Sequence, residues 1–428
     1  MNGGLSMVEM KSGYKMTEVG VIPEDWEVCE LRNHLVLLTD YDANGSFADM
    51  ASNVVTTTGN GYAWYVRATD LEQQSSLSEV KYVDEKSYRF LRKSTLYGGE
   101  VLLAKRGEIG KVYYFQMKTK RATLAPNLYL LKLKDTINSY FLFSLFKSTF
   151  GQNLLKSINA STSLGAIYKD DVKGLNILIP PFEEQASIAT ALSDVDSLIS
   201  ALTKKIEKKK AIKQGLMQQL LTGKKRLSGF NDKWKSMLLG DIAEVKDGTH
   251  QTPQYVKSGG KPFYSVENVT ADDFKNVKHI SLEEHKALTS NYRIEKGDVL
   301  MTRIGSIGCC KYVDWDVDAS FYVSLALLKI NEKYDSKFIS YLSNIKSFKE
   351  EVMLNSLVFA IPQKINLGNI SLIKVYIPTS KAEQTAIANI LSDCDSEIAA
   401  LEEKRDKYKE IKQGMMQQLL TGKIRLIK

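Results

Sequence analysis

Apolar residues recur at alternating intervals of four and three positions in two stretches of the chain. The stripes consist of Ile188, Leu192, Val195, Ile199, Leu202 and Ile206, and of Ile387, Leu391, Cys394, Ile398 and Leu401. On a helix this spacing gathers the apolar side chains into one seam, as in a coiled coil. Gly223 and Gly422, each directly after Leu-Leu-Thr, are expected to end these helices. The pattern predicts long helices over residues 182–223 and 381–422, each about 60 Å in length.

The two predicted helices end in nearly the same sequence. "IKQGLMQQLLTGKKRL" from Ile212 and "IKQGMMQQLLTGKIRL" from Ile411 differ at two of sixteen positions. A looser match lies farther upstream, where "GEVLLAKRGEIG" from Gly99 corresponds to "GDVLMTRIGSIG" from Gly297. Because internal repeats define the architecture of a chain, we interpret the sequence as a variable half and a helix, each occurring twice.

The connection between the helices predicts their relative direction. A helix this long with an apolar stripe needs a partner, and its nearest likeness lies in the same chain. The intervening half has about 150 residues, for which the radius of gyration is about 15 Å and the termini are usually close together. Such a domain cannot join points about 60 Å apart, so we expect an antiparallel pair with pseudo-two-fold symmetry. The seam positions expected to pair are Leu192, Ile199 and Leu202 on the first helix and Leu391, Ile398 and Leu401 on the second.

The two variable halves have the pattern of α/β domains. Strand-like runs such as "VLLAKRG" and "LYLLKLK" are followed by amphipathic stretches at residues 139–158 and 336–354, and then by a last apolar strand. This order predicts an α/β fold with a small mixed sheet in each half. "EDWEV" near the start matches "NDKWKS" after the first helix, so the start of the chain is expected to close onto the second helix. The predicted parts are an N-terminal segment 1–25, domains 26–181 and 224–380, long helices 182–223 and 381–422, and a tail 423–428.

Composition is compatible with a globular protein that has a polyanionic partner. The chain of 428 residues has 43% hydrophobic and 25% charged residues, a formal net charge of +8 and a pI of about 8.9. Its longest apolar run, Tyr140–Phe146, is far shorter than the roughly 20 residues of a membrane helix. The four cysteines have no metal-ligand spacing. We expect a cytoplasmic protein of a prokaryote.

Taken together, several motifs resemble the DNA-specificity subunit of type I restriction–modification enzymes. These motifs are "IPP…EEQ" and "IP…AEQ" before the helices, the twin "QGxMQQLLTGKxRL" ends, "GDVL" before "RIGSIG", and "DGTHQTPQY" at Asp247–Tyr255. The resemblance covers essentially the whole chain. It implies two target-recognition domains separated by an antiparallel two-helix coiled coil, each domain reading one half of a bipartite, asymmetric double-stranded DNA sequence. It also implies that two methyltransferase subunits dock on the helices and that restriction or translocase subunits can join them.

Candidate DNA-binding residues lie in glycine turns and in loops rich in Gly, Thr, Asn and Gln. Cations in the turns suit phosphate or guanine contact. Polar side chains in the loops "TTTGNGYAW", "DGTHQTPQY" and "NASTS" can hydrogen-bond base edges. Ordinary turn chemistry and a solvated surface are the alternatives. The candidates are Asn60, Tyr62, Lys105, Arg106, Ser161, Ser163, His250, Gln251 and Arg303.

The lysine run "KKIEKKKAIK", Lys204–Lys213, has two interpretations. It is either a solvated face of the coiled coil or a docking surface for a partner protein or DNA phosphates.

No motif for catalysis, metal binding or cofactor binding emerges. "IPPF" at Ile179–Phe182 departs from the Asn/Asp-Pro-Pro-aromatic motif of adenine methyltransferases at its first position, and its twin is "IPTS". We therefore predict a non-enzymatic recognition subunit; S-adenosylmethionine, ATP and Mg²⁺ would belong to its partner subunits. A specificity chain of a fused nuclease–methyltransferase and a coiled-coil adaptor without DNA readout remain as alternatives.

Overall fold

A computed structural model of the chain describes residues 12–160, 165–290, 292–357 and 359–426. The chain forms two compact units. Unit 1 comprises Met1–Leu202 and Lys404–Lys428, and unit 2 comprises Thr203–Glu403. Each unit therefore contains one variable half together with parts of both long helices.

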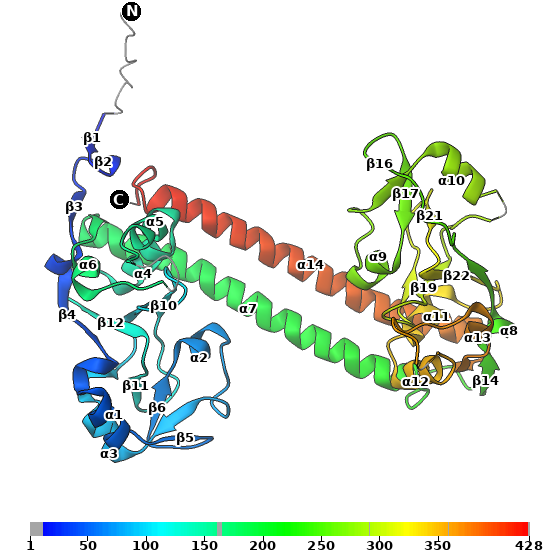
Figure 1. The fold of residues 1–428 in the computed structure, drawn as a ribbon, viewed down its shortest axis with the longest axis horizontal. Helices are drawn as coiled ribbons and strands as arrows, with labels where there is room; N and C mark the ends of the chain where they lie inside the picture. The colour runs from blue at the N-terminus through cyan, green and yellow to red at the C-terminus, as the bar shows by residue number, and fades with distance from the viewer. Residues whose placement is uncertain (1–11, 161–164, 291, 358, 427–428) are drawn as a thin grey trace, which may run out of the picture. The chain divides into compact units, whose positions relative to one another are not determined.

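The two long helices are α7 (Phe182–Leu220) and α14 (Lys381–Leu419), each continuous over its length (Figure 1). In unit 1, Lys412 near the end of α14 binds Asp196 near the start of α7, with Nζ 2.7 Å from Oδ2. In unit 2, Lys213 near the end of α7 binds Asp395 near the start of α14 at 2.5 Å. Each unit thus pairs the start of one helix with the end of the other, which confirms the antiparallel pair.

The two interhelical ion pairs belong to larger, matching clusters. The Tyr140 hydroxyl donates to Oδ2 of Asp196 at 2.5 Å in unit 1, and the Tyr341 hydroxyl donates to Oδ2 of Asp395 at 2.7 Å in unit 2. Burial raises the pKa of both tyrosines, and the neighbouring aspartates raise it further. Each tyrosine therefore stays a neutral donor that ties its variable half to the helix pair.

The seam residues pack into separate cores. Leu192 is buried in the core of unit 1 with Leu419 and Leu420, whereas Leu391 is buried in the core of unit 2 with Leu220 and Leu221. Leu202 and Ile398 are also buried, and Ile199 and Leu401 are half-buried. The ends of the seam are thus the most deeply buried, because the variable halves cover them there.

Each variable half contains an antiparallel sheet and a mixed sheet, where the sequence had suggested one mixed sheet. In unit 1 the antiparallel order is β10 (Val112–Tyr114), β9 (Val101–Ala104), β12 (Leu128–Leu133) and β4 (Leu35–Asp40). The mixed order is β5 (Thr56–Thr58), β7 (Lys81–Val83), β6 (Ala63–Val66), β11 (Ala122–Leu124) and β8 (Thr95–Leu96), with β6 and β11 parallel. In unit 2 the antiparallel order is β15 (Ala243–Asp247), β22 (Leu325–Ile330), β19 (Val299–Thr302) and β20 (Cys310–Tyr312). Its mixed order is β16 (Tyr255–Val256), β18 (Lys278–Ile280), β17 (Lys261–Tyr264) and β21 (Ser320–Phe321), with β17 and β21 parallel.

Continuous apolar runs mark the central strands because both faces of the antiparallel sheets are covered. Val101 and Leu103 of β9 pack into the core beside the long helices, whereas Leu102 and Ala104 pack into a second core with the mixed sheet. In unit 2, β19 and β22 divide their side chains in the same way. A strand that is buried on both faces does not alternate between apolar and polar residues.

The last strand of each half does not join these sheets. In unit 1 it is β13 (Asn176–Ile179), which pairs with β3 (Glu27–Glu30), and in unit 2 it is β23 (Lys374–Pro378), which pairs with β14 (Trp234–Leu238). A further hairpin, β1 (Tyr14–Thr17) and β2 (Gly20–Pro23), precedes β3.

Each amphipathic stretch forms two short helices instead of one. In unit 1 the stretch divides into α4 (Ser139–Lys147) and α5 (Thr149–Ser157), and in unit 2 into α11 (Ser336–Leu342) and α12 (Lys346–Leu354). Ser148 begins α5 by accepting the Gly151 backbone N–H at 3.2 Å. A Cβ on Gly151 would lie 2.1 Å from the Leu145 carbonyl oxygen, so this tight break requires glycine. The other helices are α1 (Phe47–Asn53), α2 (Ala68–Glu72), α3 (Glu85–Phe90), α6 (Lys169–Lys173), α8 (Leu239–Ile242), α9 (Val266–Ala271), α10 (Leu282–Leu288) and α13 (Leu367–Ser371), with 3₁₀ turns η1 (Leu31–His34), η2 (Tyr41–Asn44) and η3 (Arg92–Ser94).

The repeated phrase at each helix end supplies an arginine that pairs with a buried glutamate. Glu184 at the start of α7 is buried and binds Arg425, which follows α14, with Oε1 2.7 Å from Nε. Glu383 at the start of α14 is equally buried and binds Arg226, which follows α7, at 2.6 Å. The Trp26 indole also donates to Glu184, at 3.0 Å. The arginine of each "TGKxRL" thus neutralises the glutamate of "EEQ" or "AEQ" in its own unit.

The start of the described chain lies against the end of α14. The Tyr14 hydroxyl donates to the Gly422 carbonyl at 2.9 Å, and Asp25 binds Arg425 at 2.7 Å. Gly422 has φ +70°, and a Cβ there would lie 2.4 Å from Pro23. Glycine is therefore needed at this helix end for backbone conformation and for space.

Candidate nucleic-acid interface

In unit 2, three loops meet at a buried arginine. Arg303 follows β19, is 8% exposed, and places Nη1 2.5 Å from Oδ1 of Asp247 at the end of β15. Its Nε donates to the Ile365 carbonyl at 3.3 Å, and its own carbonyl accepts the Ile365 N–H at 2.9 Å. Nε2 of His250 lies 2.8 Å from the other oxygen of Asp247. Arg303 thereby joins the loops after β15, after β19 and before α13.

In unit 1, a buried lysine takes the same place. Lys105 follows β9, is 6% exposed, and binds Asp40 at the end of β4 at 2.9 Å and Asp42 at 2.5 Å. Its carbonyl accepts the Ile167 N–H at 3.1 Å, as Arg303 does with Ile365. Lys169 binds the second oxygen of Asp40 at 2.8 Å. The two units therefore hold their loops with the same kind of anchor, which we call the buried cation anchor.

Lys105 and Arg303, predicted as cations available for phosphate or guanine contact, are buried beside their turns instead of projecting from them, and their contact with DNA stays a prediction. Both side chains point inward, each toward an aspartate beside its turn: Asp40, which is buried and therefore requires a cation, and Asp247, which is half-buried. Burial opposes ionisation of Asp40, but hydrogen bonds from Lys169 and Lys105 outweigh it and hold its pKa below the ordinary aspartate value. Arg106, by contrast, is exposed at the turn of unit 1. Its contact with DNA stays a prediction.

The glycine motifs form tight turns between antiparallel strands, as the sequence suggested. Gly107 and Gly305 have φ of +87° and +81°, a region that favours glycine. The Gly107 N–H donates to the Gly165 carbonyl at 2.9 Å, and the Gly305 N–H donates to the Gln363 carbonyl at 2.8 Å. Each turn is thus tied to the loop that follows the short helix pair.

The remaining predicted contacts lie at loop surfaces. Asn60, His250 and Gln251 are exposed. Tyr62 is half-buried, with the Arg121 guanidinium 4.3 Å from its ring centroid and the Tyr88 ring 5.6 Å away. Ser161 and Ser163 lie outside the described residues. The structure brings His250 to the buried cation anchor of unit 2.

The lysine run on α7 is partly engaged within unit 2. Lys209 binds Glu397, Lys210 binds Glu402 at 2.7 Å, and Lys213 binds Asp395. These pairs are partly exposed and contribute little stability individually, about 0–1 kcal/mol each. They match basic positions on α7 with acidic positions on α14 and so favour the antiparallel register in unit 2.

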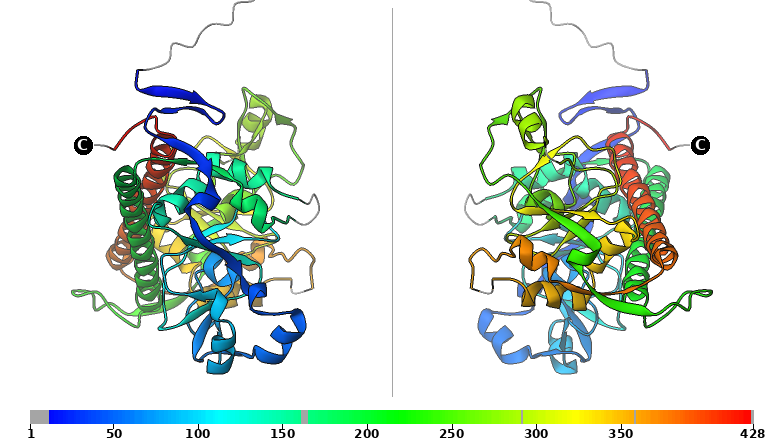
Figure 2. Two further views of the ribbon diagram at one scale, coloured as in Figure 1. Left: turned by 90° about the vertical axis from the view of Figure 1, so that its left-hand side faces the viewer. Right: turned by 90° about the vertical axis from the view of Figure 1, so that its right-hand side faces the viewer.

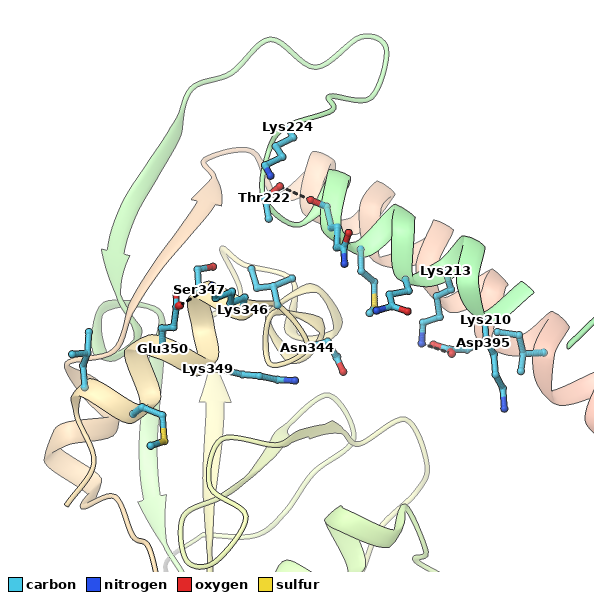
Figure 3. A pocket seen from close by; sticks show the side chains of 17 residues that line it. Lys210, Lys213, Thr222, Lys224, Asn344, Lys346, Ser347, Lys349, Glu350 and Asp395 are labelled. Atoms are coloured by element: carbon cyan, nitrogen blue, oxygen red, sulfur yellow. Dashed lines mark hydrogen bonds and ion pairs between the residues drawn. The ribbon is translucent and has the colours of Figure 1, made fainter. Parts of the chain in front are cut away.

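A groove of about 1570 Å³ lies beside the end of α7 in unit 2. Met217 of α7, Met353 of α12 and Ile345 directly before α12 supply apolar surface. Lys210 of α7 and Lys349 of α12 are among the cations around it (Figure 3). The groove is thus apolar within and mainly basic at its rim.

Within the described ranges, no group of three or more His, Cys, Asp or Glu side chains is placed to hold a metal ion. Over the same residues, no helix combines the length and apolar character needed to cross a membrane.

Comparison with known families agrees with this twofold construction. The family described as type I restriction modification DNA specificity domain matches residues 23–214 and again residues 231–413. The chain belongs to this family. Each match begins just before the buried tryptophan of one half, Trp26 or Trp234, and extends along the long helix that follows. One specificity domain therefore corresponds to one variable half and its following helix.

Two relatives in the specificity-domain family match over nearly their whole length. The putative type I restriction enzyme MjaX specificity subunit of Methanocaldococcus jannaschii is 29% identical over 441 residues, which cover 97% of both chains. The MjaVIII specificity subunit of the same organism is 24% identical over 444 residues, covering 95% of this chain and 94% of the relative. The S subunit of a type I restriction–modification system from M. genitalium has a similar fold, with a TM-score of 0.62, 17% identity, and coverage of 92% and 96%.

Sequence reasoning missed two features of the specificity-domain loops. The acidic partners Asp40 and Asp247 were not identified, although each ends an apolar or alternating strand ahead of a variable loop, in "LVLLTD" and "AEVKD". The second feature is the apolar loop "SLVFAIP", in which Phe359 and Ile361 are 98% and 99% exposed. In the sequence, this loop is marked by an apolar run that does not alternate with polar residues and that the first half lacks at this place.

Proposed function

We propose that the chain recognises a split double-stranded DNA sequence, one half-site through the loops of unit 1 and the other through the loops of unit 2. The observation that carries this proposal is the contrast between matched anchors and unmatched loops. Lys105 and Arg303 hold equivalent loops by equivalent bonds. The loops themselves differ in sequence, as "NASTSLGA" and "SLVFAIPQ" illustrate. One supporting structure that occurs twice with different loops is suited to binding two different sequences of the same kind of ligand.

The chemistry of the loops suits base edges and phosphates. Exposed Arg106 can reach guanine or phosphate, and exposed Asn60 and Gln251 can form paired hydrogen bonds with adenine. The net charge of +8 favours a polyanion at moderate salt. Binding should therefore weaken as salt rises.

We further propose that two copies of a methyltransferase subunit dock on surfaces that recur in both units. Gly215 and Gly414 occupy the same position in the repeated phrase, and a Cβ on either would meet open space. Glycine inside a helix costs about 0.5–1 kcal/mol relative to alanine, and no contact among the described residues requires a glycine at either position. Close approach of a partner helix would explain why glycine occurs at both positions. Restriction subunits would join the assembly through these partners.

In this proposal the chain selects DNA and catalyses no reaction. S-adenosylmethionine, ATP and Mg²⁺ would be bound by the partner subunits.

Two measurements test the proposed function. A mobility-shift titration with and without the methyltransferase separates a DNA-binding subunit from a coiled-coil adaptor. Mapping of methylated adenines in genomic DNA, with the gene present and deleted, then gives the target. We expect the deletion to remove one bipartite, asymmetric motif. An unchanged set of methylated adenines would contradict the proposal, as would methyl transfer by the purified chain alone.

A further inference from the structure

An apolar loop projects from unit 2 next to the buried cation anchor. Its stem closes where the Leu357 N–H donates to the Lys364 carbonyl at 2.8 Å, and Lys364 also bridges to Ile304 in the glycine turn. Phe359 and Ile361 lie in the tip and are 98% and 99% exposed. In both views of Figure 2 this orange loop stands out from the body of the unit. The stem is fixed, and its tip presents apolar side chains to the surroundings.

The exposed apolar side chains of this tip indicate a binding site. Single exposed apolar side chains are common on proteins, but a patch of them marks an interaction site. Leu354, Leu357, Phe359 and Ile361 are all exposed within eight positions. The corresponding segment of the first half, "NASTSLGA", is mainly polar in sequence, so an apolar loop is not required at this place in the repeat.

The comparison of the two units favours DNA over a partner protein as that ligand. Two copies of one partner require surfaces that match in both units, as the phrase "QQLLTGK" does. The sequence of this loop is among the segments that differ most between the two units. We therefore group it with the loops proposed to read the two different half-sites. It is also tied to Gly305, two residues after Arg303, and exposed Lys364 supplies a cation for a phosphate at its stem.

We propose that the tip of this loop wedges into the base stack of the half-site read by unit 2, with Phe359 as the inserted side chain and Ile361 beside it. Apolar side chains that enter a base step unstack it and bend the duplex. Recognition by unit 2 would then depend on how easily one base step opens, in addition to hydrogen bonds with base edges. This inference rests on the proposed function, because it requires DNA at unit 2.

The test uses the full chain with its methyltransferase and duplexes that carry the mapped target. 2-Aminopurine is placed at successive adenines of each half-site, because its fluorescence rises when it is unstacked. We expect a severalfold rise at one step of the unit 2 half-site. Phe359→Ala should remove that rise and weaken binding about 10-fold, within the range for loss of one stacking contact. Phe359→Trp should retain both.

Leu372→Ala is the matched control, because Leu372 is another exposed apolar residue of unit 2 and lies outside this loop. It should change neither fluorescence nor affinity. Full fluorescence and affinity in Phe359→Ala would overturn the wedge. Loss of methyltransferase assembly in Phe359→Ala, with the fluorescence rise retained, would assign the loop to the partner protein instead. Failure of the wild-type complex to bind its mapped target would overturn the proposed function itself.

Discussion

Units 1 and 2 have the same internal supports but present different surfaces. Both bury a cation, Lys105 after β9 or Arg303 after β19, against an aspartate at the end of the edge strand two positions away in the same sheet. Both tie a tyrosine to an aspartate and a lysine of the helix pair. The surfaces diverge: unit 1 adds η2, α1 and α3 around Tyr62, whereas unit 2 exposes the Phe359 loop. The residues that hold the loops are thus separable from the residues that would read DNA.

The largest expected effect comes from charging the buried ends of the helix seam. Leu192→Asp should unfold unit 1 and Leu391→Asp should unfold unit 2, because each leucine is buried in its own core. A carboxylate in such a site costs several kcal/mol. Thermal unfolding and hydrogen exchange would report which unit is lost.

The chain offers matched controls for these substitutions. Leu198→Asp and Ile212→Asp place the same charge at exposed positions of the same helix, one in each unit. They should leave both units folded. Equal damage from the control and core variants would refute the division of the seam between two cores.

The next effect separates the two anchors. Arg303→Met removes the buried cation that binds Asp247; loss of one partner from a fully buried pair costs about 3–5 kcal/mol, and the half-buried position of Asp247 should reduce this cost. Lys105→Met should cost less, because the Lys169 cation still binds Asp40, whereas Asp247 keeps only the imidazole of exposed His250. Each variant should weaken recognition of one half-site only. Urea unfolding and methylation mapping measure the two consequences.

A charge-preserving variant separates the effect of the ion pair from that of the hydrogen bond. Arg303→Lys keeps the ion pair but loses the Nε hydrogen bond to Ile365, so its loss should be smaller than that of Arg303→Met. If Arg303→Met left stability unchanged yet abolished binding, Arg303 would contact DNA directly instead of positioning the loops.

A smaller effect concerns pH. Because the pKa of Asp40 is lowered in the folded chain, its ion pairs stabilise unit 1 fully above the unfolded aspartate pKa, about 3.9. That contribution is lost as pH falls through the folded pKa. Lys169→Met should raise the pKa of Asp40 and reduce this acid dependence, as followed by NMR titration of the carboxyl carbon. Lys173→Met, which removes an exposed pair with Asp170 on the same helix, should leave it unchanged.

The repeat made much of the fold predictable from sequence. Heptad spacing indicated the long helices, and the length of the intervening half required an antiparallel pair. The sheets were predicted less completely, because runs such as "VLLA" and "LALL" show burial on both faces without showing which strands pair. The break between α4 and α5 depends on the contact of Gly151 with Leu145, which only the folded backbone reveals.

The candidate interface was predictable as a set of loops but not as individual side chains. Lys105 and Arg303 were located at the turns, yet their direction depends on Asp40 and Asp247, which are 65 and 56 residues away in sequence. Asn60 and Gln251 are exposed as expected, and their contacts with DNA stay predictions. The equivalent segment of the first half, "NASTSLGA", lacks the apolar run of the Phe359 loop, so comparison of the repeats did not indicate this loop.

The most direct test of the central claim, that each unit reads its own half-site, is methylation mapping after a loop exchange in unit 2. Residues 249–254, which follow the anchor residue Asp247, would be replaced by the corresponding loop of a family relative, leaving the anchor intact. The account predicts that methylated adenines move to a motif with one changed half and one unchanged half. A motif in which both halves change, or a continuous palindrome in the wild type, would contradict it.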